Sequence, residues 1–111
     1  MVSKESKVID ISPLTIGDLE QVMDIEPVAF GSHHWTRQSF MNELINPSGF
    51  YYAAREHENE RVLGYSGFWL IGEEAHVTTL AVHPDYRRLY VGERLLINDI
   101  IQARKVGADW V

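Results

Sequence analysis

Two adjacent arginines, Arg87 and Arg88, are the residues whose type and position point most directly to a chemical task. They follow a β-favouring run and precede a long apolar pattern with helical spacing. A helix leaves the N–H groups of its first turn without backbone acceptors and carries a partial positive charge at that end. Two guanidinium groups beside such amides suit a diphosphate better than a single carboxylate. The segment therefore indicates a nucleotide-type ligand, with a solvated charge pair before an ordinary helix as the alternative.

Histidines are the next candidates. His76 lies within a β-favouring run, and an unperturbed histidine pKa of about 6.5 suits proton transfer through a water molecule. The alternative for His76 is a packed or surface side chain. His33 and His34 are neighbours whose side chains diverge, and no carboxylate follows them at metal-ligand spacing. We therefore predict no metal site.

Apolar periodicity and turn residues predict the elements that position these groups. The predicted helices cover about residues 16–29, a short segment after Thr36 that ends at Asn46 and Pro47, and a long segment after the loop RRLYVG that ends at Gly107. The predicted strands cover residues 8–11, 50–55, 61–71 and 75–82, with a further start at 109–111. Pro27 lacks an N–H group, so the first helix is expected to kink or end near Glu26.

These elements predict an α/β fold. The three central strands form an antiparallel meander flanked by helices, and the segment 109–111 would return parallel to the third of them by a right-handed crossover. The apolar face of the long helix is expected to consist of Leu95, Leu96, Ile100, Ala103 and Val106. A strand of three residues is a poor final edge, so we expect a single domain, residues 1–111, that is incomplete at its C-terminus.

Composition excludes several classes of protein. The 111 residues are 45% hydrophobic and contain no cysteine, which excludes a disulfide scaffold and thiolate chemistry. A formal net charge of -6 argues against a broad nucleic-acid surface. No apolar run approaches the roughly 20 residues that span a bilayer, so we expect a cytoplasmic protein without a membrane partner.

The run T-L-A-V-H-P-D-Y-R-R-L-Y-V-G-E-R-L-L, from Thr79 to Leu96, resembles motif A of the GCN5-related N-acetyltransferases. The segments D-I-E-P-V-A-F, W-T-R-Q-S-F, L-G-Y-S-G-F and E-A-H-V-T-T-L-A-V resemble the bacterial members that acetylate the N-terminal alanine of a ribosomal protein. The likeness extends over about residues 9–111. It implies direct transfer of an acetyl group from acetyl-CoA to an amine, with a peptide or protein N-terminus as acceptor.

The resemblance also implies site residues. The main chain around the end of the third meander strand would receive the pantetheine arm, and the loop written R/Q-x-x-G-x-G/A would hold the pyrophosphate. The cofactor-binding residues implied are Leu80, Ala81, Val82, Arg87, Arg88, Leu89, Tyr90, Val91, Gly92 and Glu93. Glu26 would lie near the path of the acceptor, where its carboxylate could attract an ammonium group, with a solvated helical charge as the alternative.

Two features depart from the family pattern. Tyr90 occupies the position at which the family pattern has its first glycine. A tyrosine there costs conformational energy if the backbone needs a positive φ, but it is tolerated if the position needs only space and the side chain points outward. The general base and general acid of the resembled enzymes are expected beyond the position of Trp110. A small-molecule amine acetyltransferase and an inactive acyl-CoA-binding remnant therefore stay as alternative functions.

Overall fold

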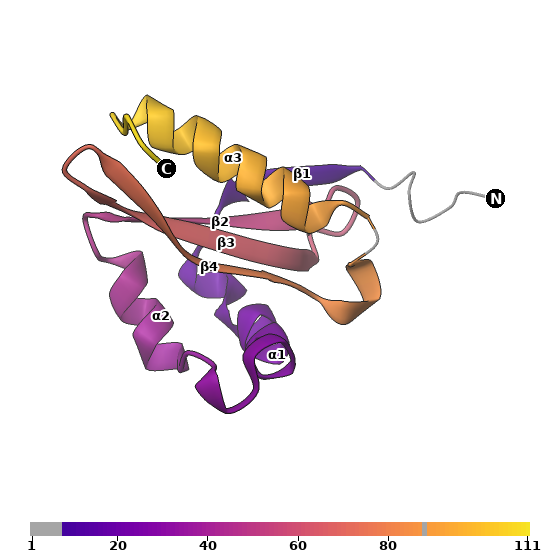
Figure 1. The fold of residues 1–111 in the computed structure, drawn as a ribbon. Helices are drawn as coiled ribbons and strands as arrows, with labels where there is room; N and C mark the ends of the chain where they lie inside the picture. The colour runs from indigo at the N-terminus through magenta and orange to yellow at the C-terminus, as the bar shows by residue number, and fades with distance from the viewer. Residues whose placement is uncertain (1–7, 88) are drawn as a thin grey trace.

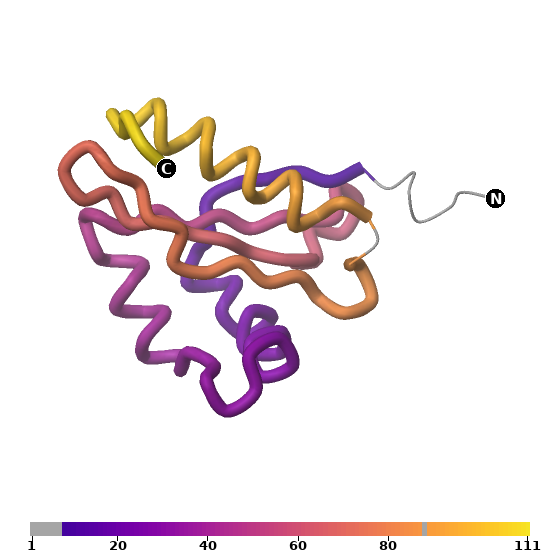
Figure 2. Tube along the Cα trace, viewed as in Figure 1, coloured from indigo at the N-terminus to yellow at the C-terminus, as the bar shows by residue number. Residues whose placement is uncertain are grey.

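A four-stranded antiparallel sheet in the order β1-β2-β3-β4 forms the centre of the computed structural model, which describes residues 8–87 and 89–111 (Figure 1). The strands are β1 (Ile9–Pro13), β2 (Gly49–Glu56), β3 (Val62–Ile71) and β4 (Glu74–Val82). The helices are α1 (Leu19–Phe30), α2 (Arg37–Leu44) and α3 (Val91–Lys105). Helices α1 and α2 cover one face of the sheet and α3 covers the other, as the tube in Figure 2 also shows. This arrangement confirms the predicted α/β fold and its antiparallel meander.

The two faces of the sheet bury different sets of side chains because successive residues of a strand point to opposite sides. On the face toward α1 and α2, Ala53 and Tyr65 pack with Val22 and Phe40. On the face toward α3, apolar strand residues pack in two clusters around the side chains of Val91, Leu95 and Ala103. Strand β3 is buried on both faces, so it fixes the position of β4 beside it.

Helix α1 does not end at Glu26. A short 3-10 turn (Ile16–Asp18) precedes it, and the helix continues through Pro27 to Phe30. The expected end at Glu26 is wrong because burial of the side chains of Ile25 and Glu26 offsets the hydrogen bond that Pro27 cannot donate. The chain turns only at Gly31, whose φ of 57° lies in the left-handed region and whose N–H bonds to the carbonyl of Pro27. A 3-10 turn (Gly31–His33) then leads to α2, which Thr36 caps as predicted.

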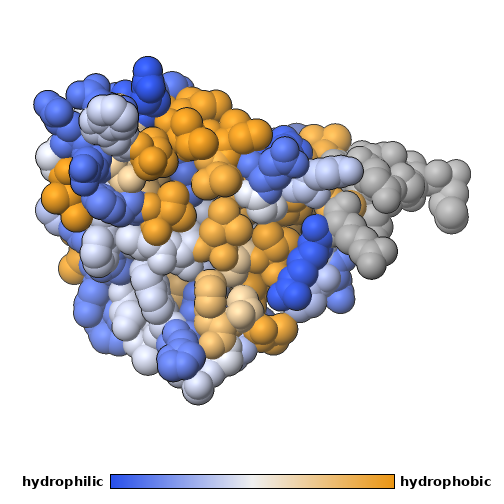
Figure 3. Space-filling view, in the orientation of Figure 1, coloured by the Kyte–Doolittle hydropathy of each residue, from blue (hydrophilic) through white to orange (hydrophobic). Residues whose placement is uncertain are grey.

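The expected apolar face of α3 is only partly correct. Leu95 and Ala103 are buried, but Leu96 and Ile100 are each 42% exposed. The helix instead directs the line Val91, Leu95, Asp99 and Ala103 at the sheet, with residues spaced by four positions. The hydroxyl of Ser66 on β3 donates a 2.9 Å hydrogen bond to Asp99 Oδ1, which lets a carboxyl group occupy a core position. Figure 3 shows apolar surface over this part of the molecule.

The end of the described chain pairs in parallel with the first residue of β4, as predicted. Trp110 and Glu74 form an isolated parallel bridge, and the Ala75 N–H donates to the carbonyl of Trp110 over 2.7 Å. The rest of β4 has no strand on its outer side among the described residues, so its main chain forms the edge of the sheet. Across the described residues, each helix is too short or too polar to cross a bilayer.

The buried carboxyl of Asp99 predicts a loss of stability as pH rises. Burial raises its pKa from 3.8 to about 6, so the folded state favours the protonated form. This contribution is complete below about pH 3 and is lost as pH rises through about 6. Because one unit of pKa corresponds to about 1.4 kcal/mol, the free energy of unfolding should fall by about 3 kcal/mol between pH 3 and pH 7.5 through this group.

Asp99→Asn removes that titration while keeping an acceptor for Ser66. Urea unfolding of the parent and of Asp99→Asn across this pH range measures the effect as the difference between the two profiles. The free energy of unfolding of Asp99→Asn should increase relative to that of the parent as pH increases. Parallel profiles would contradict the raised pKa of Asp99.

Candidate active site

The connection between β4 and α3 is built by two buried side chains. After a short 3-10 turn (Pro84–Tyr86), the side chains of Leu89 and Val91 enter the core, where they are 6% and 0% exposed. They pack with Leu63 and Leu95 in one cluster. Because these side chains point inward, the backbone between them is held at the surface. Arg88 lies outside the described residues.

Tyr90 takes the left-handed backbone conformation, with φ 59° and ψ 23°. The backbone at this position therefore has a positive φ. Glycine adopts such a φ at the least steric cost, which gives the glycine of the family pattern a conformational reason. The ring of Tyr90 is 68% exposed and lies outside the core. The conformation costs a non-glycine residue about 1 kcal/mol or more, and the burial of its two neighbours stabilises it.

The first turn of α3 presents backbone N–H groups at the start of the helix. None of the N–H groups of residues 90–93 has an acceptor among the described residues; Val91 is fully buried, whereas Tyr90 and Glu93 are exposed, and the Arg94 N–H bonds to the carbonyl of Tyr90 over 3.0 Å. The fifteen-residue helix adds the positive end of its dipole at this point. A Cβ at Gly92 would make only ordinary contacts of 3.5 Å with Leu80 and Val82, so the loop admits glycine or alanine there.

The arginines near this turn have different partners. Arg87 is exposed, and its Nε lies 3.5 Å from the carbonyl oxygen of Val82 at the end of β4. This contact places the guanidinium group between the strand end and the loop. Arg94 donates to the carbonyl oxygen of Ile9 over 3.1 Å and so connects α3 to β1. Arg87 is therefore the described cation best placed to bind an anion at the loop.

The edge of β4 presents main-chain groups where the sequence predicts the pantetheine arm. The His83 N–H points inward and donates to the carbonyl of Leu63, while the carbonyl of Val82 receives Arg87 on the outer side. Main-chain groups alternate direction along a strand, so Leu80 and Val82 direct their N–H and C=O groups to the free edge. Ala81 is buried on the face toward α1. The role of Leu80, Ala81 and Val82 stays a prediction that this edge supports.

The carboxylate of Glu26 is buried at 1% exposure and both of its oxygens accept hydrogen bonds. Oε1 accepts from the hydroxyl of Tyr65 over 2.6 Å, and Oε2 accepts from the Trp35 N–H over 2.8 Å. Burial and this carboxylate raise the pKa of the Tyr65 hydroxyl, which therefore stays protonated and donates. The structure thus makes Glu26 a group that positions the loop before α2, and its attraction for an ammonium stays untested.

His76 lies exposed on β4, and one ring nitrogen is 3.1 Å from Glu74 Oε2. It pairs in register with Trp69 of β3, so it belongs to the sheet face that α1 and α2 cover. Its predicted role as a proton relay through water stays a prediction.

Sequence reasoning missed Glu43, which joins three elements. Its Oε1 accepts from the hydroxyl of Tyr51 and from the indole N–H of Trp69, each over 2.6 Å, and from Asn46 over 3.4 Å. These hydrogen bonds outweigh burial and lower the pKa of the Glu43 carboxyl. The available signal was its spacing, because Glu43 stands three residues after the buried Phe40 and so faces the sheet.

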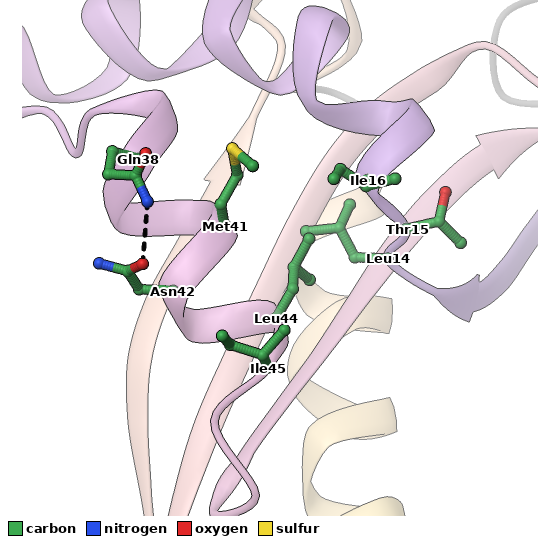
Figure 4. Close-up of a pocket in the computed structure, with 8 residues that line it drawn as sticks. All are labelled: Leu14, Thr15, Ile16, Gln38, Met41, Asn42, Leu44 and Ile45. Carbon is green, nitrogen blue, oxygen red and sulfur yellow. Dashed lines mark hydrogen bonds between the residues drawn. The ribbon is translucent and has the colours of Figure 1, made fainter.

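A separate apolar pocket of about 400 Å³ lies between α2 and the segment after β1 (Figure 4). Its lining contains no titratable side chain: Leu14, Thr15, Ile16, Gln38, Met41, Asn42, Leu44 and Ile45. The chemistry-bearing groups therefore lie elsewhere, on the two sides of β4. No cluster of three or more histidine or acidic side chains that could hold a metal ion occurs within residues 8–87 and 89–111.

Residues 18–109 match the model of the acetyltransferase (GNAT) family. The chain belongs to that family. This membership confirms the resemblance seen in the run from Thr79 to Leu96.

Relatives of known sequence and structure agree. A candidate ribosomal protein bS18-alanine N-acetyltransferase of Bacillus subtilis is 33% identical over 82 residues, which are 74% of this chain and 53% of that protein. The crystal structure of the ribosomal-protein-S18-alanine N-acetyltransferase of Escherichia coli superimposes with a TM-score of 0.78 and 25% identity, covering 91% of this chain and 63% of that one. The PaiA N-acetyltransferase of Thermoplasma acidophilum in complex with coenzyme A gives a TM-score of 0.76 at 18% identity, over 90% and 74% of the two chains. The GNAT chain thus spans about half the length of the curated Bacillus subtilis relative.

The strained backbone at Tyr90 predicts that glycine stabilises the fold. Tyr90→Gly removes the steric cost of the left-handed conformation and loses no buried contact, so the free energy of unfolding should rise by about 1 kcal/mol. Chemical denaturation measures this change. Arg87→Gly is the matched control, because Arg87 has φ -65° and gains nothing from glycine. Its stability should stay equal or fall, and an equal rise for both variants would refute the argument from φ.

Proposed function

We propose that this chain binds acetyl-CoA and takes part in the transfer of its acetyl group to a primary amine. One observation carries the proposal: the start of α3, where the amides of residues 90–93 have no acceptor among the described residues, follows closely on the free edge of β4 in a chain of the acetyltransferase family. A helix N-terminus with free N–H groups binds phosphate through hydrogen bonds and the helix dipole. The strand edge supplies the donors and acceptors that an extended amide-containing arm requires.

Each part of the site has a separate task. The amides of residues 90–93 and the guanidinium group of Arg87 hold the diphosphate, and the main chain of Leu80 and Val82 receives the pantetheine arm. Acetyl-CoA supplies an activated thioester: the amine nitrogen forms a bond to the acetyl carbon, the carbon–sulfur bond breaks, and the amine loses a proton. The residues of this chain bind and orient the reactants, and His76 is the predicted relay for that proton.

We propose the N-terminal amine of a protein that begins with alanine as the acceptor, with a ribosomal protein as the specific case and the cytoplasm as the place of reaction. The support is the sequence likeness to the Bacillus subtilis relative and the 25% identity to the Escherichia coli enzyme, both named for that acceptor. Release of the CoA thiol in the presence of a peptide that begins with alanine tests this acceptor. Faster release with a small primary amine than with the peptide would favour the small-molecule alternative instead.

Replacement of Arg87 by alanine should weaken the binding of CoA about tenfold, because one charge-assisted contact to the diphosphate is lost. Binding of pantetheine, which has no diphosphate, should stay unchanged. Calorimetric titration of both ligands measures the two affinities. Arg37→Ala is the control, since Arg37 is exposed on α2 at the opposite face of the sheet. An equal loss for CoA and pantetheine would contradict the placement of Arg87 at the diphosphate.

A further inference from the structure

The Glu43 carboxylate lies where α2 meets the sheet, and only one of its two oxygens has hydrogen-bond partners among the described residues. Its Oε1 holds the three donors described above, whereas its Oε2 has no hydrogen-bond partner among the described residues. No arginine, lysine or histidine of residues 8–87 and 89–111 forms an ion pair with it. The hydrogen bonds on Oε1 keep the pKa of Glu43 low, so this carboxylate is an anion without a counter-cation at neutral pH.

The side chain of Tyr51 extends from β2 across β3, so that its hydroxyl lies next to β4. The ring of Tyr51 lies over Gly67 of β3, where any Cβ would collide with it. The hydroxyl then lies 3.2 Å from Thr78 Oγ1 on β4. Because the proton of this hydroxyl is donated to Glu43, Thr78 is the donor in the contact between the two hydroxyls, which links Glu43 to β4 through Tyr51.

Thr78 is the extra residue of a β-bulge in β4. Gly67 pairs with Thr79 and Phe68 pairs with Val77, so Thr78 has no partner residue on β3. Bulges re-aim side chains and occur at the edges of sheets beside active sites. Thr78 also stands two residues before Leu80, at which the predicted pantetheine edge begins. The bulge thus brings the Glu43 and Tyr51 pair to the part of β4 that precedes the cofactor edge.

The surroundings favour a cation over an anion or an apolar group. The half-buried indoles of Trp35 and Trp69 flank the pair, with the Trp35 ring 6.3 Å from that of Tyr51. Aromatic rings together with an unpaired carboxylate are the usual recognition elements for ammonium groups. Other carboxylates on this face have partners: both oxygens of Glu26 accept hydrogen bonds, Asp18 pairs with Arg55, and Glu74 lies against His76. Glu43 is therefore the anion available to a positively charged acceptor.

We propose that Glu43, with the Tyr51 hydroxyl that it orients, forms the subsite that receives the protonated acceptor amine beside the β4 bulge. This inference rests on the proposed function, because it places the acceptor on the side of β4 opposite to α3. It assigns to Glu43 the role that the sequence assigned to Glu26. It also makes a primary or N-terminal ammonium, rather than a neutral or acidic group, the chemical class that the site selects.

The test is direct binding of an amine, observed at Trp69. The full chain, labelled with ¹⁵N, is titrated with the tripeptide amide Ala-Ala-Ala-NH₂, and the indole N–H resonance of Trp69 is followed. The resonance should shift with saturation, and added salt should weaken the binding because the attraction is between charges. The N-acetylated tripeptide should produce no comparable shift.

Glu43→Gln keeps an acceptor oxygen for Tyr51 and Trp69 but removes the charge, and it should weaken binding of the free amine at least tenfold. Glu58→Gln is the matched control, an exposed carboxylate in the turn between β2 and β3 that should bind as the parent does. Thermal melting establishes that both variants are folded. The proposal is overturned if Glu43→Gln binds as tightly as the parent, if the acetylated peptide binds equally well, or if the parent gives no saturable shift.

Titration of the same samples with CoA separates this inference from the proposed function. Both variants should bind CoA like the parent, because neither Glu43 nor Glu58 belongs to the loop before α3 or to the edge of β4. A parent chain that fails to bind CoA contradicts the proposed function. A parent chain that binds CoA but shows no dependence of amine binding on Glu43 contradicts only the acceptor subsite.

Discussion

The burial of Leu89 and Val91 on either side of Tyr90 is the constraint on which the site depends. Both side chains belong to the core between α3 and the sheet, so the residue between them must reverse the chain direction in a single step. Tyr90 accordingly lies in the left-handed region, with its side chain exposed directly before α3. The anion-binding character of the loop is thus a consequence of core packing and does not depend on the side chain of Tyr90.

The opposite face of β4 is ordered by carboxylates. Glu26 ties the segment after α1 to β3 through Tyr65 and Trp35, and Glu43 ties α2 to β2 and β3 through Tyr51 and Trp69. These hydrogen bonds hold the side chains of Tyr51, Tyr65 and Trp69 and the main chain at Trp35 in place. Ordered carboxylates therefore lie on the sheet face toward α1 and α2.

The sequence predicted the features that depend on local pattern. Period-two alternation and turn residues located all three meander strands, and the Thr36 cap located α2, because both signals act over a few neighbouring residues. The resemblance to the acetyltransferases followed from the run between Thr79 and Leu96, and the family match confirms it. The sequence also identified Tyr90 as a position that could need a positive φ, and the structure gives it a φ of 59°.

Features that depend on tertiary partners were not predictable in this way. The exposure of Leu96 and the burial of Asp99 depend on how α3 rotates over Ser66, which no local periodicity specifies. Helix α1 passes Pro27 because its other side chains are buried. The sequence analysis did not single out Glu43, because its donors Tyr51 and Trp69 follow it by 8 and 26 residues, on strands β2 and β3.

The most direct test of the central claim is the response of the loop amides to CoA. In a ¹H–¹⁵N titration, the backbone resonances of Tyr90, Val91, Gly92 and Glu93 should shift to lower field and saturate together, because their N–H groups gain phosphate acceptors. Amides of α2, which lies on the opposite face of the sheet, should not move. If CoA leaves residues 90–93 unchanged, or shifts only residues on the face toward α1, then these amides do not hold the diphosphate and the account is wrong.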